Sequence, residues 1–508
     1  MFSFVCEYFK AASPVPLALS ATSPAARRAV ERSSRGYVVQ GLRLHHEEFR
    51  KDEEVSCHRR PTRTVCIHAE SIPLTFFHAL WWIRKDGAHV PVVFRAARLT
   101  GSLYYGVNLP PATDAVAPAD ATVASVLSMH DPAVASLVRR TVSLFVGGSR
   151  LRAVQLNPSA VTELERIDVS NCRCLTSLQW SRAEAAADGA EDSGSNSAEQ
   201  LHHLRILKAS FSGLVVFPAP TLAAWAPALT TALLSGCRAL SREQVNNLLD
   251  DCLELRVARL DSTKLSSIDS FALTCPRLSE LNVSNCADLQ DVSALAALSS
   301  LRVLDLHGNA SLASLDGVGG GGPLRRLDIS HCKRISTLRP LEGRLTKLER
   351  FNASHCSGLL DTQLGALRTS LLLEEVKVNQ CPSLRDFSAL SHHANLTVVE
   401  AADTAIAGVD FLRSCTALER LSVAGCANLT DLTALRGLYR LVSVDACHSG
   451  VTRMAELLDT CSALRVVLVR DCELDTESTD RLEACAPRIA STHRAVNSGN
   501  SAPVTATA

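Results

Sequence analysis

The sequence predicts an α/β solenoid, in which short parallel strands line up as one sheet and turns or short helices pack behind them. Three observations support this fold class. One leucine pattern recurs thirteen times in the 508 residues. After a first gap of 40 residues, successive copies start 22 to 26 residues apart. A small polar residue or cysteine then follows most copies at a fixed distance. One such unit cannot bury its own leucines, but stacking at the strand spacing of about 4.8 Å buries them together.

The repeated pattern is clearest at residues 278–289, which read LSELNVSNCADL, or L-x-x-L-x-L-x-x-C-x-x-L. Counting from each opening leucine, offsets 3 and 5 should point inward, and offsets 2, 4 and 6 should point to the concave face of the sheet. In four copies one residue fewer follows the strand. The opening leucines are Leu164, Leu204, Leu229, Leu255, Leu278, Leu301, Leu324, Leu348, Leu373, Leu396, Leu418, Leu441 and Leu464.

These residues closely resemble the leucine-rich repeat family, and the resemblance covers residues 151–490. It implies a horseshoe with a parallel sheet on the concave side and short helices or 3₁₀ turns on the convex side. The 26-residue unit with a capping box from Ser241 to Gln244 is similar to the cysteine-containing subclass found behind F-boxes. Shorter units, with backs such as residues 291–295, are similar to the phosphatase-regulator and internalin type. Strings such as Ser-His-Cys also resemble leucine-rich repeat proteins of kinetoplastid protozoa.

Offset 8 is expected to turn inward at the end of each strand. In the family this ladder position carries a small polar side chain that satisfies backbone groups of the bending loop. A second set of cysteines (Cys252, Cys275, Cys415 and Cys461) stands three residues before an opening leucine. Buried free cysteine packs as a small hydrophobe, so both sets are interpreted as structural. The ladder residues are Cys172, Cys237, Cys286, Asn309, Cys332, Cys356, Cys381, Cys426 and Cys472.

Composition narrows the partners and the compartment. Lys+Arg and Asp+Glu are equal at 52 each, so no net field attracts nucleic acid or an anionic membrane, and neither is expected as a partner. No apolar run reaches the roughly 18 residues of a membrane span. So many thiols favour a reducing compartment, so a cytoplasmic location is predicted, with the nucleus as the alternative. Several serines together with Arg27, Arg28, Arg32 and Arg35 suggest a mitochondrial presequence, but Glu7 and Glu31 argue against that location.

The chain is expected to divide into six parts. Asp131-Pro132 is a typical helix start, and helical spacing continues to residue 146. Residues 181–200 are rich in Ala, Ser, Gly and acids and lack an apolar period. The parts are a disordered leader (1–35), a small mixed α/β domain (36–130), an N-terminal cap of helix and strand (131–163), the repeats with a disordered insert at 181–200 (164–474), a C-terminal cap helix (475–490) and a disordered tail (491–508).

Two arrangements could carry chemistry. Cys57, Cys66 and His68 offer three zinc ligands, but no paired C-x₂-C or H-x₃₋₅-H spacing accompanies them. Ser330-His331 lies near aspartates of the same face, which suggests a hydrolase. Serine recurs at offset 6 in six of the thirteen copies, however, so the consensus explains it. The prediction is therefore no catalytic residue, no metal and no cofactor, with an enzyme or zinc module in the N-terminal domain as the remoter alternative.

The concave face offers a patterned polar surface, and its middle part is the predicted partner-binding site. Opposite charges side by side in a sheet partly compensate, so a solvated face without a ligand is the competing interpretation. The candidate residues are Glu280, Asn282, Asp305, His307, Arg326, Asp328, His331, Arg350, Asn352 and His355.

The sequence thus predicts a non-catalytic scaffold or adaptor that binds a protein partner on the concave face of the solenoid. This function rests partly on the family resemblance, because one repeat architecture serves many functions. The cysteine-containing unit suggests an alternative, a substrate-recognition subunit of a ubiquitin ligase, although residues 36–110 contain no clear F-box. Neither the identity of the partner nor the oligomeric state is indicated by the sequence.

Overall fold

The chain divides into two compact units, Met1–Leu265 with Leu273–Leu278, and Ser266–Ala272 with Ser279–Ala508. The predicted leader, the insert up to residue 199, Cys57 and the tail beyond residue 491 lie outside the described residues. The computed structural model describes residues 37–39, 42–47, 64–69, 92–95, 126–128, 141–145, 153–156, 158, 161–162, 164–180, 200–360 and 364–491.

In the first unit, four copies of the leucine pattern form neighbouring parallel strands. They are β8 (Arg166–Asp168), β10 (Ile206–Lys208), β11 (Thr231–Leu233) and β12 (Val257–Arg259). Strand β10 pairs with β8 and β11, and β11 pairs with β12. Helix α6 (Arg242–Asn247) follows β11, and the capping box predicted at Ser241 and Gln244 is confirmed. Helix α7 (Asp269–Thr274) follows β12 and contains residues of both units.

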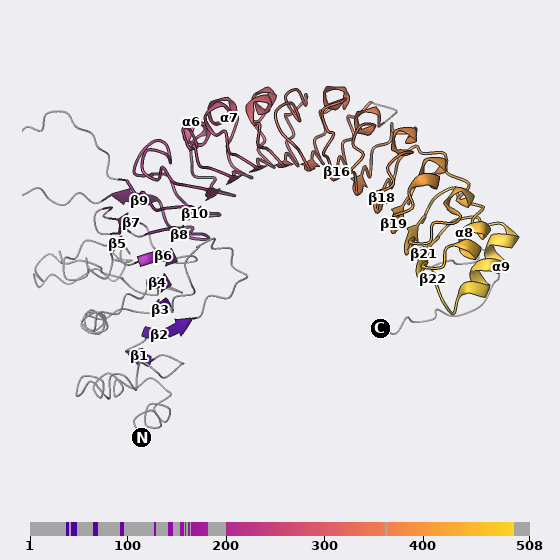
Figure 1. The fold of residues 1–508 in the computed structure, drawn as a ribbon, viewed down its shortest axis with the longest axis horizontal. Helices are drawn as coiled ribbons and strands as arrows, with labels where there is room; N and C mark the ends of the chain where they lie inside the picture. The colour runs from indigo at the N-terminus through magenta and orange to yellow at the C-terminus, as the bar shows by residue number, and fades with distance from the viewer. Residues whose placement is uncertain are drawn as a thin grey trace, which may run out of the picture. The chain divides into compact units, whose positions relative to one another are not determined.

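In the second unit, each strand pairs in parallel with the next one along the chain. Strands β16, β18, β19, β21 and β22 lie along one side in Figure 1, and the helices α8 and α9 lie on the other. The strands are β13 (Glu280–Asn282), β14 (Val303–Asp305), β15 (Arg326–Asp328), β16 (Arg350–Asn352), β17 (Glu375–Lys377), β18 (Val398–Glu400), β19 (Arg420–Ser422), β20 (Ser443–Asp445), β21 (Val466–Leu468) and β22 (Ala490–Ser491). Between them lie the 3₁₀ turns η1 (Ser293–Ala297), η2 (Arg339–Leu341), η3 (Gly365–Leu367), η4 (Ser388–Leu390), η5 (Asp410–Ser414) and η6 (Thr433–Leu435), and the helices α8 (Ala455–Thr460) and α9 (Thr476–Cys485).

The predicted solenoid of parallel strands is confirmed. All thirteen copies of the pattern place a strand at offsets 2 to 4. The side chains at offset 3 form a buried column in which Leu281, Leu304 and Leu327 are at most 2% exposed, and register pairing places these three on successive strands. The offset 5 side chains, such as Val283 and Leu306, are buried as well. Successive repeats therefore share one core, as the leucine spacing requires.

The N-terminal strands differ from the sequence prediction. Strand β6 (Thr141–Phe145) pairs in parallel with β8, β4 (Val92–Arg95) pairs with β6, and β3 (Thr64–Ala69) pairs with β4. The sheet of the repeats thus continues into part of residues 36–130, for which a separate small domain was expected. The strands β1 (Tyr37–Val39) and β2 (Leu42–Glu47) join β3 as an antiparallel meander.

The helix predicted for residues 131–146 is wrong over its last turn, which is strand β6. Apolar Val142 and Leu144 alternate with Thr141 and Ser143, a period of two that suits a strand beside a neighbouring strand better than a helix. Leu144 is fully buried.

A second, three-stranded parallel sheet lies in the first unit. It consists of β5 (Val126–Ser128), β7 (Ala153–Leu156) and β9 (Ser177–Trp180). The strand predicted within the N-terminal cap (131–163) is β7. Its Val154 and Leu156 are fully buried. Strand β9 belongs to the back of the first repeat, where no strand was predicted.

At the C-terminal end of the second unit, helix α9 follows the last repeat. Its N-cap is Asp475, whose carboxylate accepts the backbone N–H of Ser478 at 2.8 Å. Leu482 is buried, while Cys485 is only partly covered. Strand β22 then adds a last pair to β21, where the sequence expected the helix to run into a tail.

Candidate functional site

Each strand of the repeats ends in a left-handed turn at offset 7. This conformation favours glycine, asparagine and aspartate, which occupy seven of the thirteen positions. That enrichment was visible in the sequence but was not recognised. Two candidate binding residues, His331 and His355, hold this conformation with φ of 59° and 62°. The thirteen residues are Asn171, Phe211, Gly236, Ser262, Asn285, Gly308, His331, His355, Gln380, Asp403, Gly425, His448 and Asp471.

The turn sends offset 8 into the core, where all nine predicted ladder residues are buried. The thiol of Cys332 donates to the backbone carbonyl of Leu306 at 3.2 Å, an offset 5 residue of the preceding repeat. Asn309 uses its amide instead, donating to Val283 O at 3.1 Å and accepting the backbone N–H of Cys286 at 2.9 Å. The same thiol-to-carbonyl contact occurs at Cys237, Cys356, Cys381, Cys426 and Cys472.

The four shorter repeats carry a serine or threonine at offset 8, which the sequence analysis missed. These residues are Ser212, Thr263, Thr404 and Ser449, and all four are buried. The hydroxyl of Thr404 donates to Ala401 O at 2.8 Å and lies 3.5 Å from the sulfur of Cys426 in the next repeat. Hydroxyl and thiol therefore serve the same place in the turn.

Burial makes the ladder thiols poor nucleophiles. It raises the pKa of Cys332 to about 11 and that of Cys381 to about 11, because a thiolate is poorly solvated in the core. The reactive form of cysteine is the thiolate, so these side chains are suited to a structural role.

On the sheet face, four candidate residues at offset 4 cap the ends of their own strands. The side-chain oxygens of Asn282, Asp305, Asp328 and Asn352 each accept the backbone N–H two residues further on, at 2.9 to 3.1 Å. In each residue one side-chain oxygen is therefore occupied by a hydrogen bond within its own repeat, and each residue is half-buried.

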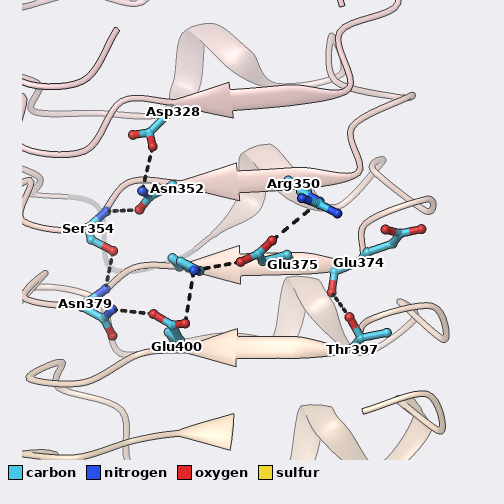
Figure 2. Close-up of polar contacts among 10 residues, drawn as sticks. Asp328, Arg350, Asn352, Ser354, Glu374, Glu375, Asn379, Thr397 and Glu400 are labelled. Carbon is cyan, nitrogen blue, oxygen red and sulfur yellow. Dashed lines mark hydrogen bonds and ion pairs between the residues drawn. The ribbon is translucent and has the colours of Figure 1, made fainter. Parts of the chain in front are cut away.

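A hydrogen-bonded network crosses the strands from β15 to β18 (Figure 2). The amide of Asn352 donates to Asp328 Oδ2 at 2.9 Å, and the hydroxyl of Ser354 accepts the backbone N–H of Asn379 at 3.2 Å. The amide of Asn379 then donates to Glu400 Oε2 at 3.1 Å. No sequence rule pairs side chains across repeats, so this network could not be predicted.

The charges of β16 to β18 compensate one another (Figure 2). Arg350 Nε lies 3.6 Å from Glu375, and Lys377 Nζ lies 2.8 Å from Glu375 and 3.3 Å from Glu400. The hydrogen bond to Glu375 and the nearby Glu400 raise the pKa of Lys377. Of the candidate residues, Arg350 is thus already engaged within the sheet.

Three histidines form a column at the ends of β14 to β16. The rings of His331 and His355 stack with centroids 4.1 Å apart, and His307 meets His331 edge-on at 4.9 Å. His355 Nδ1 lies 2.7 Å from Gln380 Oε1, which is only an acceptor, so Nδ1 carries the hydrogen. Burial, followed by repulsion from His355 and His307, lowers the pKa of His331.

Ser330 does not have the contacts of a catalytic serine. Its hydroxyl donates directly to Asp328 Oδ1 at 2.5 Å, so it must accept its second hydrogen bond from His307 Nδ1 at 2.8 Å. In a catalytic triad the serine donates to the histidine, which then abstracts its proton. Here the order is reversed, and the adjacent His331 makes no contact with the hydroxyl among the interactions of the described residues.

In the part of the chain that the structure describes, no three His, Cys, Asp or Glu side chains lie where they could share a metal ion. Of the three residues weighed as alternative zinc ligands, Cys66 and His68 lie in β3, and Cys57 lies outside the described residues. No described helix has the length and apolar character needed to cross a bilayer.

The in-register strands, the shared leucine core and the inward turn at offset 8 define a leucine-rich repeat fold. A solved structure shares this fold. The chain resembles a leucine-rich repeat protein of Leptospira interrogans with a TM-score of 0.50 and 15% identity, over 68% of this chain and 90% of that one. An internalin of Listeria monocytogenes gives a TM-score of 0.48 and 15% identity, over 72% of this chain and 89% of that one.

Two curated proteins of Arabidopsis thaliana are similar in sequence. The protein named SUPPRESSOR OF npr1-1, CONSTITUTIVE 1 is 28% identical over 167 residues, and a probable disease resistance protein is 26% identical over 216 residues. These alignments cover 29% and 37% of this chain. They span only 11% and 17% of the length of those proteins. No protein-family model matches the chain.

Proposed function

We propose that this protein is a non-catalytic scaffold or adaptor that binds a protein partner on the sheet face of its second unit. The observation that carries the proposal is the contrast between two parts of that face. From β16 to β18 the charged side chains pair with one another. Further toward the N-terminus, Glu280, Arg326 and His331 are exposed, and none makes an ion pair with a residue that the structure describes. The unpaired charges of Glu280 and Arg326 are available to a partner.

The fold supports the proposal, because stacked repeats present an extended surface of side chains on a rigid sheet. The offset 4 caps order the ends of β13 to β16, which lowers the backbone entropy lost on binding. The buried free thiols favour a reducing compartment, so we propose a cytoplasmic location. The ubiquitin-ligase alternative stays a prediction of the sequence, and no contact in the described residues favours it.

Affinity purification of the full chain with matched variants tests the proposal. The face variant carries Glu280→Ala, Arg326→Ala and His331→Asn. The control variant carries Arg420→Ala, Ser443→Ala and Arg470→Ala, which lie on the same sheet toward its C-terminal end. We expect the control to recover the same partners as the natural sequence and the face variant to lose them. Equal recovery by both variants would show that binding occurs elsewhere.

A further inference from the structure

Positive charge without a partner gathers where β14 to β16 begin. The backbone N–H groups of Arg325 and Arg326 both donate to the carbonyl of Arg302, at 2.7 and 3.0 Å, so the three residues lie together. Arg326 stands directly opposite Arg350 in the register of β15 and β16. Like charges at such positions repel, which is a cost to the fold.

Only two of these four arginines have a carboxylate nearby. Arg325 Nη1 lies 2.6 Å from Glu349, and Arg350 lies 3.6 Å from Glu375. Arg302 and Arg326 are exposed and form no ion pair with any described residue. A guanidinium presents a rigid fork of donors that matches a carboxylate, so these two side chains are suited to bind acidic groups.

The other ends of the same strands carry the histidine column and Lys333. Between the two ends lie Asp305 and Asp328, each held by hydrogen bonds within the sheet. We term the surface formed by Arg326, Asp305, Asp328 and the three histidines, with the exposed Arg302 directly before β14 at its rim, the arginine–histidine face. The arginines stand at one edge of this face and the histidines at the other, and the two aspartates lie between them.

We propose that the arginine–histidine face binds an acidic protein segment, whose Asp or Glu carboxylates pair with Arg302 and Arg326. This inference rests on the proposed function and names the chemistry of the partner. A nucleic acid fits less well, because its continuous phosphates would pass over Asp305 and Asp328. A peptide can place separate carboxylates at the edges and its amides over the middle. The whole chain has equal numbers of acidic and basic residues, so its net charge does not attract a long polyanion. Only the local charge of this face acts on the ligand, which favours a protein segment.

Binding should strengthen as the pH falls below the ordinary imidazole pKa of about 6.5, where His331 gains charge while glutamates stay ionised. Burial, followed by repulsion from His355, His307 and Lys333, lowers the pKa of His331. Asp328 opposes that effect. Gln380, which contacts His355, carries no charge.

The probe is a fluorescein-labelled peptide of alternating glutamate and glycine, titrated with the full chain at low ionic strength and followed by fluorescence anisotropy. A lysine–glycine peptide and a single-stranded DNA oligonucleotide serve as comparison probes. We expect the acidic peptide to bind best. Arg326→Glu should weaken its binding about tenfold, the scale of one charge-assisted hydrogen bond. Arg420→Glu, at the same offset in a distant repeat, should change it less than about twofold.

His331→Asn should reduce the gain in affinity at low pH, since asparagine suits the left-handed turn and does not titrate. Tighter binding of DNA than of the acidic peptide, or an equal loss from Arg326→Glu and Arg420→Glu, would overturn the inference. If the face variant loses its cellular partner while the acidic peptide does not bind, the inference fails and the proposed function stands. If the face variant keeps its cellular partner and Arg326→Glu keeps its affinity for the acidic peptide, both the inference and the proposed function are contradicted.

Discussion

The thiol of Cys356 donates to the backbone carbonyl of Ile329 in the preceding repeat, with 3.1 Å between sulfur and oxygen. Both residues are fully buried. The bond satisfies a carbonyl at the point where a strand ends and the chain turns, and it links one repeat to the next. The same carbonyl also accepts the backbone N–H of Cys332 at 3.3 Å, so the thiol is its second donor. A typical intramolecular hydrogen bond contributes about 0.5–1.5 kcal/mol to stability.

Removing this donor should therefore destabilise the fold. Cys356→Ala is expected to lower the free energy of unfolding by about 0.5–1.5 kcal/mol, and Cys356→Ser should recover part of the loss because a hydroxyl can donate as well. Urea titration followed by circular dichroism measures both. The control is Cys174→Ala, an exposed cysteine whose replacement should change stability by less than about 0.5 kcal/mol. If the two alanine variants are equally stable, the ladder cysteine at position 356 does not stabilise the fold.

The second set of cysteines should resist alkylation in the native protein. Burial, the largest cause, raises the pKa of Cys252 to about 12 and that of Cys275 to about 11. Since the thiolate is the reactive form, iodoacetamide at mildly alkaline pH should label Cys174 first among the described cysteines. Peptide mass spectrometry over time measures the order. Labelling of Cys252 as fast as Cys174 would show that the core is open, and unfolding in urea should abolish the difference.

Stability should depend on the titration of His331. Its folded pKa is lowered below the ordinary value of 6.5, so the folded state binds fewer protons than the unfolded chain. The resulting stabilisation is fully present above pH 6.5 and is lost as the pH falls through the folded pKa. His331→Asn should make the decrease of Tm between neutral and mildly acidic pH slightly shallower. Gln380→Asn, at the same turn position, should leave the slope unchanged. A steeper slope in His331→Asn would contradict the assignment.

Gly358 marks a close approach between repeats. A Cβ atom there would overlap the backbone carbonyl oxygen of Lys333. Gly358→Ala should therefore lower the free energy of unfolding by about 1–3 kcal/mol, as overpacking does. At Gly365 the nearest atom is Glu342 Oε1 at 3.7 Å, so Gly365→Ala should be tolerated. Thermal unfolding of the two variants separates them, and similar Tm values would refute the close approach.

The repeat frame was predictable because core burial imposes it on every copy. Leu281 and Cys286 recur at fixed offsets, and both lie where the leucine spacing places them. The ladder residues of the four shorter copies were not recognised, because a hydroxyl residue such as Thr404 stands where the pattern predicts cysteine. The three histidines were predicted to lie on the same face, but the contacts between their rings were not. His307 stands at offset 6 and His331 at offset 7, so the repeat pattern does not place them in one column.

The partners of the face residues could not be predicted for a different reason. Whether a charge such as Arg350 or Arg326 is free depends on which side chain stands on the adjacent strand and on the rotamer it adopts. Those are properties of the folded sheet and not of one repeat. The strand at 141–145 was missed because a short apolar run fits either period until a neighbouring strand is known.

The register of the repeats is the central claim, and cross-linking across adjacent strands tests it most directly. Val303 stands opposite Arg326, and Arg326 stands opposite Arg350, so Val303 and Arg350 are two strands apart. Neighbouring strands lie about 4.8 Å apart, within the Cα separation of about 4.4–6.8 Å that a disulfide spans, and twice that spacing is beyond it. Mild oxidation should therefore join the cysteines of Val303→Cys with Arg326→Cys, and should leave those of Val303→Cys with Arg350→Cys unlinked, as read by mass spectrometry of the digested protein. Cross-linking of the second pair but not the first would contradict the stacked repeats.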